Sequence, residues 1–284
     1  MKGIITKGIG GFYYVKAEDG AVHECKARGI FRKNGIKPTI GDRVEISGGS
    51  IDEIYERSSY LVRPSVANID NLVIVIAAAS PAPDLLLTDK LTVVADAAGI
   101  TPVICINKTD LAEPERIAGI YESAGFRVIV MSAKEQSGAQ ELQAVLKGRV
   151  SAFAGLSGVG KSSILNLLCG NLAETGEVSR INRGKHTTRH VELFETEDGT
   201  YILDTPGFSS LKITEICDIK AAELAGHFPE FANAGGCRFK GCSHINEPDC
   251  AVKQLVESGA AALSRYESYK ELYGQLKEVK DWEV

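Results

Sequence analysis

Residues 155–162 read Gly-Leu-Ser-Gly-Val-Gly-Lys-Ser and follow an apolar, β-forming run at 150–154. The spacing matches G-x-x-x-x-G-K-[ST], a loop whose backbone N–H groups surround a phosphate when a strand precedes it and a helix follows. Both neighbours are expected here, because residues 161–168 carry apolar side chains at helical spacing. The stretch therefore predicts a P-loop at the end of a buried strand, with Lys161 offsetting phosphate charge.

Apolar strands alternate with helical segments on the N-terminal side of this loop. We expect strands at 72–79, 103–106, 127–131 and 150–154, separated by helices at 85–98, 114–124 and 138–147. This alternation indicates a parallel sheet covered by helices on both faces. A helix at 161–168, a polar stretch at 169–190 and strands at 191–195 and 201–203 follow.

Two smaller units flank this α/β region. Residues 1–65 contain five short β-forming runs, at 3–6, 12–16, 22–26, 43–46 and 51–55, separated by turn residues. Five strands in roughly 60 residues predict a small closed barrel, either an OB-fold that binds oligonucleotides or an SH3-like barrel of structural use. Residues 211–284 read as a helix, a cysteine-rich loop and a further helix.

Composition excludes several classes of protein. The 284 residues are 44% hydrophobic and 24% charged, which argues against a disordered, collagenous or coiled-coil chain. The longest apolar run, at 72–79, is far shorter than the roughly 20 residues of a membrane helix. Lys7 interrupts the first apolar segment and no small-residue cleavage site follows it. We therefore expect a cytoplasmic protein without a secretory signal and without a membrane partner.

The net charge of −5 conceals a basic stretch near the N-terminus. Residues 26–37 hold no acid and contain five basic side chains: Lys26, Arg28, Arg32, Lys33 and Lys37. Such a stretch is either a surface for a phosphate backbone or a solvated loop face. Arg180, Arg183, Lys185 and Arg189 form a second acid-free group.

Asn107-Lys108-Thr109-Asp110 directly follows the strand at 103–106 and matches N-K-x-D. One carboxylate at Asp110 can accept hydrogen bonds from N1–H and the 2-amino group of guanine, whereas adenine has no such donor pair. Ser132-Ala133-Lys134 follows the next strand and suits the companion loop that meets the guanine O6. The pattern therefore predicts GTP in preference to ATP.

Magnesium ligands are expected on both sides of the polar stretch. The Ser162 hydroxyl can ligate Mg²⁺. Asp204-Thr-Pro-Gly207 fits D-x-x-G, in which Asp204 holds Mg²⁺ through water and the Gly207 N–H meets the γ-phosphate. Either Thr187 or Thr188 can add a hydroxyl when the γ-phosphate is present, and we favour Thr188.

The group that orients the attacking water is less obvious. Ras-type GTPases place a glutamine after the D-x-x-G glycine, but this chain has Phe208, which can neither donate nor accept a hydrogen bond. His186 is our candidate, with His190 second. The alternatives are that a partner supplies the group, or that His186 contacts only RNA or solvent.

Cys237-x4-Cys242-x-His244-x5-Cys250 places three thiolates and one imidazole within 14 residues. A Cys₃His set is a typical structural zinc site, because no position remains for a reactive water. The other cysteines are scattered and are expected to be single buried thiols: Cys25, Cys105, Cys169 and Cys217.

Residues 263–279 repeat apolar side chains at helical spacing, which predicts a packing stripe. Four basic residues lie on the same segment, namely Arg265, Lys270, Lys277 and Lys280. They either contact phosphates or lie solvated among the interleaved acids.

The motifs occur in an unusual order, because N-K-x-D and S-A-K precede the P-loop instead of following D-x-x-G. A doubly wound domain tolerates such a permutation, since its contacts depend on which strands are adjacent. With the barrel and the C-x4-C-x-H-x5-C pattern, this order closely resembles the bacterial ribosome small subunit-dependent GTPase A family over nearly the whole chain. The resemblance implies a late maturation factor of the 30S subunit that binds rRNA and is stimulated by the 30S particle. It also assigns a catalytic role to the histidine that matches His186.

We therefore expect a multidomain protein with an OB-fold barrel at 1–65, a circularly permuted α/β GTPase domain at 66–210 and an α-helical zinc-binding domain at 211–284. It should act as a monomer on the 30S subunit and its 16S rRNA. The rivals are a regulatory switch with a non-ribosomal protein partner, a P-loop kinase or ATPase, and a nucleic-acid chaperone. The expected ligands are GTP or GDP, Mg²⁺ and one Zn²⁺. The expected residues are Lys161, His186 and Thr188 for catalysis; Asn107, Lys108, Asp110, Ser132, Ala133, Lys134, Gly155, Leu156, Ser157, Gly158, Val159, Gly160, Lys161, Ser162, Ser163, Asp204 and Gly207 for nucleotide; Ser162, Thr188 and Asp204 for magnesium; and Cys237, Cys242, His244 and Cys250 for zinc.

Overall fold

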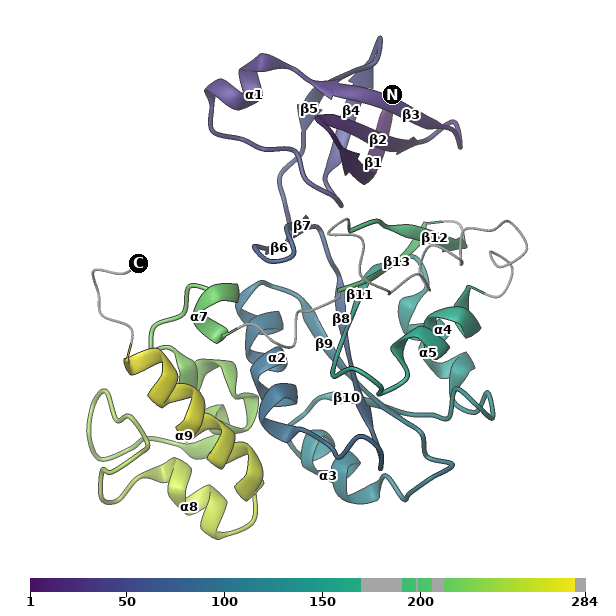
Figure 1. Ribbon diagram of the computed structural model, residues 1–284. Coiled ribbons are helices and arrows are strands. Elements are labelled where there is room, and N and C mark those ends of the chain that lie inside the picture. The colour runs from purple at the N-terminus through teal and green to yellow at the C-terminus, as the bar shows by residue number, and fades with distance from the viewer. Residues whose placement is uncertain (170–190, 198, 206–211, 279–284) are drawn as a thin grey trace.

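The computed structural model describes residues 1–169, 191–197, 199–205 and 212–278. A β-barrel lies at one end, a six-stranded sheet flanked by helices forms the centre, and a helical module packs beside the sheet (Figure 1). Within these residues no helix is long and apolar enough to cross a membrane.

The N-terminal barrel closes in the strand order β1-β2-β3-β5-β4. A short helix, α1 (Gly29–Lys33), lies between β3 and β4. This partly Greek-key order is that of an OB-fold and not of an SH3-like barrel. The barrel has a separate core that includes the fully buried Ile5, Val15 and Val44. All five predicted strands are present, whereas α1 was not predicted because five residues are too few to show a helical period. The strands are β1 (Lys2–Ile9), β2 (Phe12–Ala17), β3 (Val22–Ala27), β4 (Arg43–Ser47) and β5 (Ser50–Ile54).

The barrel is attached to the central sheet through two segments. A small hairpin of β6 (Tyr60–Leu61) and β7 (Val66–Ala67) leads from β5 into the sheet. On the other side, the backbone N–H of Leu193 donates to the Thr6 carbonyl at 2.9 Å, and Lys7 pairs with Glu192 at 3.0 Å. The chain just before β12 therefore docks on the first barrel strand.

The central sheet has the order β10-β9-β8-β11-β13-β12. The first five of these strands are parallel, and the edge strand β12 runs antiparallel to β13. The antiparallel edge was not predicted, and strand β12 begins at Phe194 instead of residue 191. The bounds are β8 (Asn71–Ala77), β9 (Thr101–Asn107), β10 (Arg127–Val130), β11 (Val150–Ala154), β12 (Phe194–Glu197) and β13 (Thr200–Asp204).

Helices cover both faces of the sheet, as the pattern predicted. Alternate residues of β8 face opposite sides, because side chains alternate along a strand. Ile74 belongs to the core under α2 (Leu85–Ala97) and α3 (Glu115–Ser123), whereas Val75 belongs to the core under α4 (Ala139–Leu146) and α5 (Lys161–Leu168).

The C-terminal module packs against α2, and its apolar residues continue the core on that face of the sheet. The predicted stripe is largely buried on α9, where Tyr269 and Leu272 are at most 1% exposed. Among the four scattered cysteines, Cys25, Cys105 and Cys169 are buried and Cys217 is partly exposed. The module consists of α7 (Ile213–Ile216), the 3₁₀ helices η2 (Leu224–His227) and η3 (Pro229–Ala234), α8 (Ala251–Glu257) and α9 (Leu263–Lys277).

One interpretation of this segment is wrong. Arg265 does not face solvent and cannot contact a phosphate backbone, because its side chain is 1% exposed. Its guanidinium donates to Asp89 on α2 at 2.7 Å and to both carboxylate oxygens of Glu230 on η3. The arginine therefore joins the C-terminal module to the central domain. Lys270 and Lys277 are exposed, and Lys280 lies outside the described residues.

Candidate nucleotide and metal sites

The motif residues converge on one edge of the sheet. Strands β8, β9, β10, β11 and β13 are parallel, so the loops after them meet at their carboxyl ends. Asn107 ends β9, Ser132 follows β10, Gly155 follows β11 and Asp204 ends β13. Loops that are far apart in the sequence thus form one site.

Close packing at the P-loop explains two of its glycines. Gly155 has a φ of +142°, and a Cβ there would lie 2.2 Å from the Val75 carbonyl oxygen. Gly160 has a φ of +98°, and a Cβ there would lie 2.2 Å from the side-chain nitrogen of Asn107. Only glycine fits at either position.

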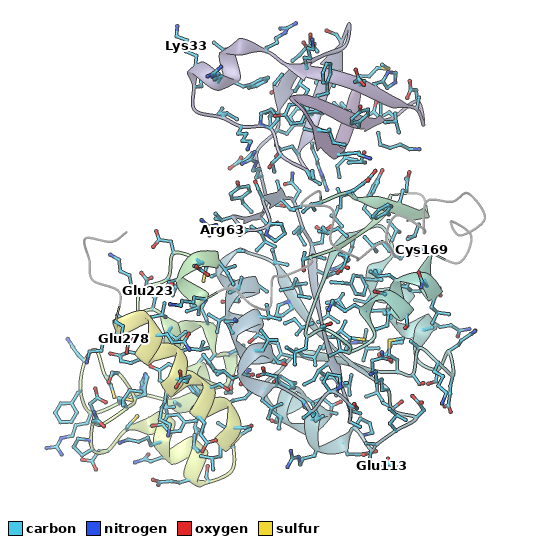
Figure 2. All side chains as sticks on the ribbon, viewed as in Figure 1. Lys33, Arg63, Glu113, Cys169, Glu223 and Glu278 are labelled. Carbon is cyan, nitrogen blue, oxygen red and sulfur yellow. The ribbon has the colours of Figure 1, made fainter. Side chains whose placement is uncertain are left out.

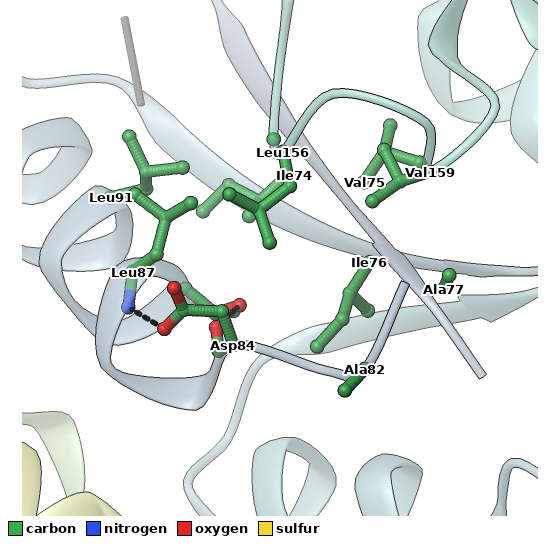
Figure 3. A pocket seen from close by; sticks show the side chains of 12 residues that line it. Ile74, Val75, Ile76, Ala77, Ala82, Asp84, Leu87, Leu91, Leu156 and Val159 are labelled. Carbon is green, nitrogen blue, oxygen red and sulfur yellow. Dashed lines mark hydrogen bonds between the residues drawn. The ribbon is translucent and has the colours of Figure 1, made fainter. Parts of the chain in front are cut away.

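Apolar side chains fix the loop from behind. Figure 3 shows a small pocket between β8 and the start of α2, in which Leu156 of the P-loop lies beside Ile74 and Val159 lies beside Val75. Most of its lining is apolar, and its one charged side chain, Asp84, is a carboxylate that accepts from the Leu87 N–H at 2.9 Å. The pocket anchors the loop, while Ser157 and Gly158 remain exposed on the outer side.

The phosphate side of the site contains a lysine and a carboxylate. Lys161, the first residue of α5, donates from Nζ to the carbonyls of Gly155 at 2.8 Å and Leu156 at 2.9 Å. Burial lowers the pKa of Lys161 and raises that of Asp204, and each charge opposes the other group's shift. Asp204 Oδ1 is buried without a hydrogen bond to any described residue.

These observations fit a bound phosphate and a divalent cation. Among the described residues, the Lys161 ammonium donates to two backbone carbonyls, and it can turn from them to an anion. The unsatisfied Asp204 oxygen is what a hydrated cation would bind. Ser162 and Ser163 are exposed at the start of α5, where a hydroxyl can reach the same cation.

The base loop is tied directly to the P-loop. The Asn107 amide donates to the Val159 carbonyl at 2.9 Å and its oxygen accepts from the Ala133 N–H at 3.0 Å. Lys108, with a φ of +66°, donates from Nζ to the Gly158 carbonyl at 2.6 Å. The three predicted motifs therefore form one hydrogen-bonded unit.

Asp110 is oriented by the companion loop. One carboxylate oxygen accepts from the Ser132 hydroxyl at 2.8 Å, and the other accepts from Lys134 Nζ at 3.2 Å. The Ser132 hydrogen bond is the main reason why the pKa of Asp110 is lowered. The Lys134 side chain is 78% exposed, so its contact can give way to a ligand. The charged carboxylate keeps lone pairs free for a donor pair such as that of guanine.

Two supporting residues were not predicted. The Ser80 carbonyl accepts from Lys108 Nζ, and the Ser137 hydroxyl accepts from the Ser132 N–H at 3.1 Å. Neither belongs to a spaced motif, so no sequence signal marked them. Other expected residues lie outside the described parts of the chain and stay predictions: His186, Thr187, Thr188, His190, Gly207 and Phe208.

The four expected zinc ligands meet in the C-terminal module. The ligand atoms of Cys237, Cys242, His244 and Cys250 all lie within 4.8 Å of one another. The two sulfurs of Cys237 and Cys250 are 3.9 Å apart, and His244 Nδ1 lies 3.5 Å and 3.3 Å from them. A tetrahedron with ordinary zinc bond lengths separates two sulfurs by about 3.8 Å and a sulfur from a nitrogen by about 3.5 Å. Cys237, His244 and Cys250 therefore have the spacing of three zinc ligands, and Cys242 completes the set within 4.8 Å.

Residues outside the motif hold this cluster. The hydroxyls of Tyr266 and Tyr269 on α9 donate to the carbonyls of His244 at 2.6 Å and Ser243 at 2.7 Å. The Glu247 carboxylate accepts from the Ser243 N–H and hydroxyl, which lowers its pKa to about 2. The sequence marked the tyrosines only as packing residues, since spacing does not show where a hydroxyl points.

A parallel α/β sheet, a P-loop and a carboxylate-bearing base loop at its carboxyl edge define a nucleotide-binding domain of the GTPase class, with the motif order permuted. The model of the RsgA GTPase family matches residues 54–214, and that of the RsgA N-terminal domain matches residues 2–53. The chain belongs to the RsgA GTPase family.

Relatives and solved structures agree over the full chain. The small ribosomal subunit biogenesis GTPase RsgA of Ruminiclostridium cellulolyticum is 47% identical, covering 99% of this chain and 95% of the relative. The protein of the same name from Alkaliphilus metalliredigens is 45% identical, covering 97% and 98%. The crystal structure of YjeQ from Thermotoga maritima has a TM-score of 0.83 at 35% identity, covering 98% of this chain and 99% of that one. YloQ, described as a circularly permuted GTPase, has a TM-score of 0.81 at 37% identity, covering 98% and 96%.

Proposed function

We propose that this protein hydrolyses GTP while it assists late maturation of the small ribosomal subunit, and that the 30S particle stimulates the hydrolysis. The observation that carries the guanine preference is the oriented Asp110 carboxylate beside the P-loop. The assembly role is supported by its relatives, which are small ribosomal subunit biogenesis GTPases and match nearly the whole chain.

Different residues at the carboxyl edge of the sheet bind the base, the phosphates and the cation. Asp110 reads the guanine, with Ser132 keeping it charged, and Lys161 balances phosphate charge. Ser162 and Asp204 hold Mg²⁺ together with Thr188. When bound, this cation neutralises charge on the phosphates. We assign the remaining residues of the P-loop, the N-K-x-D loop and the S-A-K loop to nucleotide contacts as well.

Catalysis needs a group that orients water, and we assign this role to His186. The 30S particle would then act by placing His186 or by supplying a group of its own. Zinc at the four-residue cluster has a structural role, because protein atoms fill all four ligand positions.

The basic stretch on the barrel is our proposed rRNA surface. Arg32, Lys33 and Lys37 are exposed, and Figure 2 shows Lys33 at the outer end of the barrel, pointing away from it. Arg28 differs, because it pairs with Asp52 at 2.7 Å. We infer that these exposed side chains contact RNA phosphates.

We also infer that the protein acts in the cytoplasm as a monomer. Its domains are assigned to residues 1–65, 66–210 and 211–284.

Salt dependence of 30S binding tests this surface. Each phosphate contact contributes roughly 0.7–0.9 to the slope of log affinity against log salt. The double change Arg32→Gln with Lys33→Gln should weaken 30S binding and lower the slope by roughly 1.4–1.8. Arg116→Gln on α3 with Lys220→Gln in the C-terminal module, both exposed and outside the barrel, serves as the control. Equal slopes for the two double variants, or equal binding to 30S and 50S particles, would contradict the proposal.

A further inference from the structure

The zinc cluster presents an exposed aromatic residue between two cations. Residues 238–241, Arg-Phe-Lys-Gly, connect the first two cysteines of the cluster. Phe239 is 44% exposed, whereas phenylalanine is among the residues most often fully buried. Arg238 and Lys240 on either side are exposed as well. In Figure 1 the chain before α8 loops along the outer edge of the module.

This loop is held in place before any partner arrives. Cys237 and Cys242 at its two ends belong to the metal cluster, and Tyr266 and Tyr269 fix the backbone that follows. An exposed ring on a fixed loop loses little conformational entropy on binding. The loop is therefore preorganised for binding.

The charges around the ring favour an anionic partner. The Arg238 guanidinium lies 5.5 Å from the centre of the Phe239 ring. Arg238 also pairs with Asp249 at 2.8 Å, but both side chains are more than 60% exposed, and such pairs are weak. That pair uses one nitrogen of the guanidinium and leaves other donors. The nearby Glu247 carboxylate is occupied by the backbone and hydroxyl donors of its own loop.

We propose that Phe239 stacks on an unpaired base of RNA while Arg238 and Lys240 contact the adjoining phosphates. The inference rests on the proposed function and adds a second RNA contact on a different domain from the barrel. A ring flanked by cations suits a base and its phosphate backbone. A protein partner would favour an aromatic residue inside an apolar patch, whereas this tripeptide is flanked in the chain by Cys237 of the metal cluster and by Gly241.

Affinity for the 30S particle tests the stacking. Base stacking on a protein ring corresponds to roughly a 5- to 150-fold loss of affinity when the ring is removed. Full-length, zinc-loaded Phe239→Ala should therefore bind 30S particles more weakly by that factor, with the salt slope unchanged. Phe239→Trp should retain the affinity, and Lys240→Gln should lower the slope by roughly 1. Leu263→Ala, which changes another exposed apolar residue of the module, is the matched control.

A photocrosslinker identifies the partner. A benzophenone amino acid in place of Phe239 should crosslink to 16S rRNA in the 30S complex. Crosslinking to a ribosomal protein, or Phe239→Ala binding as well as the wild type, overturns the inference. If the wild type binds 30S and the barrel variant weakens it while Phe239→Ala does not, only this inference fails. If the wild type does not prefer 30S, the proposed function fails with it.

Discussion

Replacing Arg265 by Met should loosen the C-terminal module from the central domain. The Arg265 side chain is 1% exposed, and those of its partners Asp89 and Glu230 are 0% and 4% exposed. The guanidinium also lies 4.8 Å from the centre of the Phe228 ring and 4.9 Å from that of Phe126. Methionine keeps most of the apolar volume but leaves two buried carboxylates without a cation.

The expected cost follows from this burial. Removing one partner of a buried ion pair costs about 3–5 kcal/mol, because the remaining charge stays desolvated. Hydrogen exchange of the amides in α2 and α9 should then be faster by roughly a hundredfold to several thousandfold, since each 1.36 kcal/mol is a factor of ten. The assay is exchange followed by mass spectrometry, with peptides of the barrel as an internal reference.

Lys270→Met is the control, because Lys270 is exposed on the same helix. This substitution should change the free energy of local opening, as measured by exchange, by less than about 0.5 kcal/mol. Exchange in α2 and α9 that is the same for Arg265→Met and Lys270→Met would refute the claim that this arginine joins the two parts.

Four further predictions concern the nucleotide and metal sites. Asp110→Asn should move the preference from GTP towards XTP, measured by competition binding; unchanged preference would refute the assigned role. Ser132→Ala should raise the pKa of Asp110, because the hydrogen bond that lowers it is removed. As the pH of a binding titration is lowered, the variant should therefore lose guanine affinity at a higher pH than the wild type does. Gly160→Ala should abolish nucleotide binding because its Cβ overlaps the base-loop amide, whereas Gly119→Ala, in open space on α3, should leave it intact. Cys250→Ser should reduce bound zinc well below one per chain and loosen the C-terminal helices while the sheet persists, as metal analysis and circular dichroism would show.

Much of the central domain follows from the sequence because its pattern is local. Strand β9 was expected at 103–106 and spans Thr101–Asn107, and α2 was expected at 85–98 and spans Leu85–Ala97. Parallel strands bring their carboxyl ends together, so the meeting of Asn107 with the P-loop also followed from the motifs. Short elements did not, since the five-residue α1 has no measurable period.

Contacts between segments that are distant in the chain could not be predicted from the sequence. Arg265 was grouped with exposed lysines, yet its partner Asp89 lies 176 residues away in the chain. Helical spacing shows which residues share a face but not which face another element covers. For the same reason the hydroxyl contacts of Tyr266 and Tyr269 with the zinc loop appeared only in the structure.

Mg²⁺-dependent hydrolysis of GTP and ATP by the pure protein, alone and with 30S or 50S particles, tests the guanine preference and the assembly role together. We expect slow turnover of GTP, little turnover of ATP, and strong stimulation by 30S particles only. Equal use of ATP would contradict the role of Asp110, and stimulation by neither particle or by both equally would contradict the assembly role.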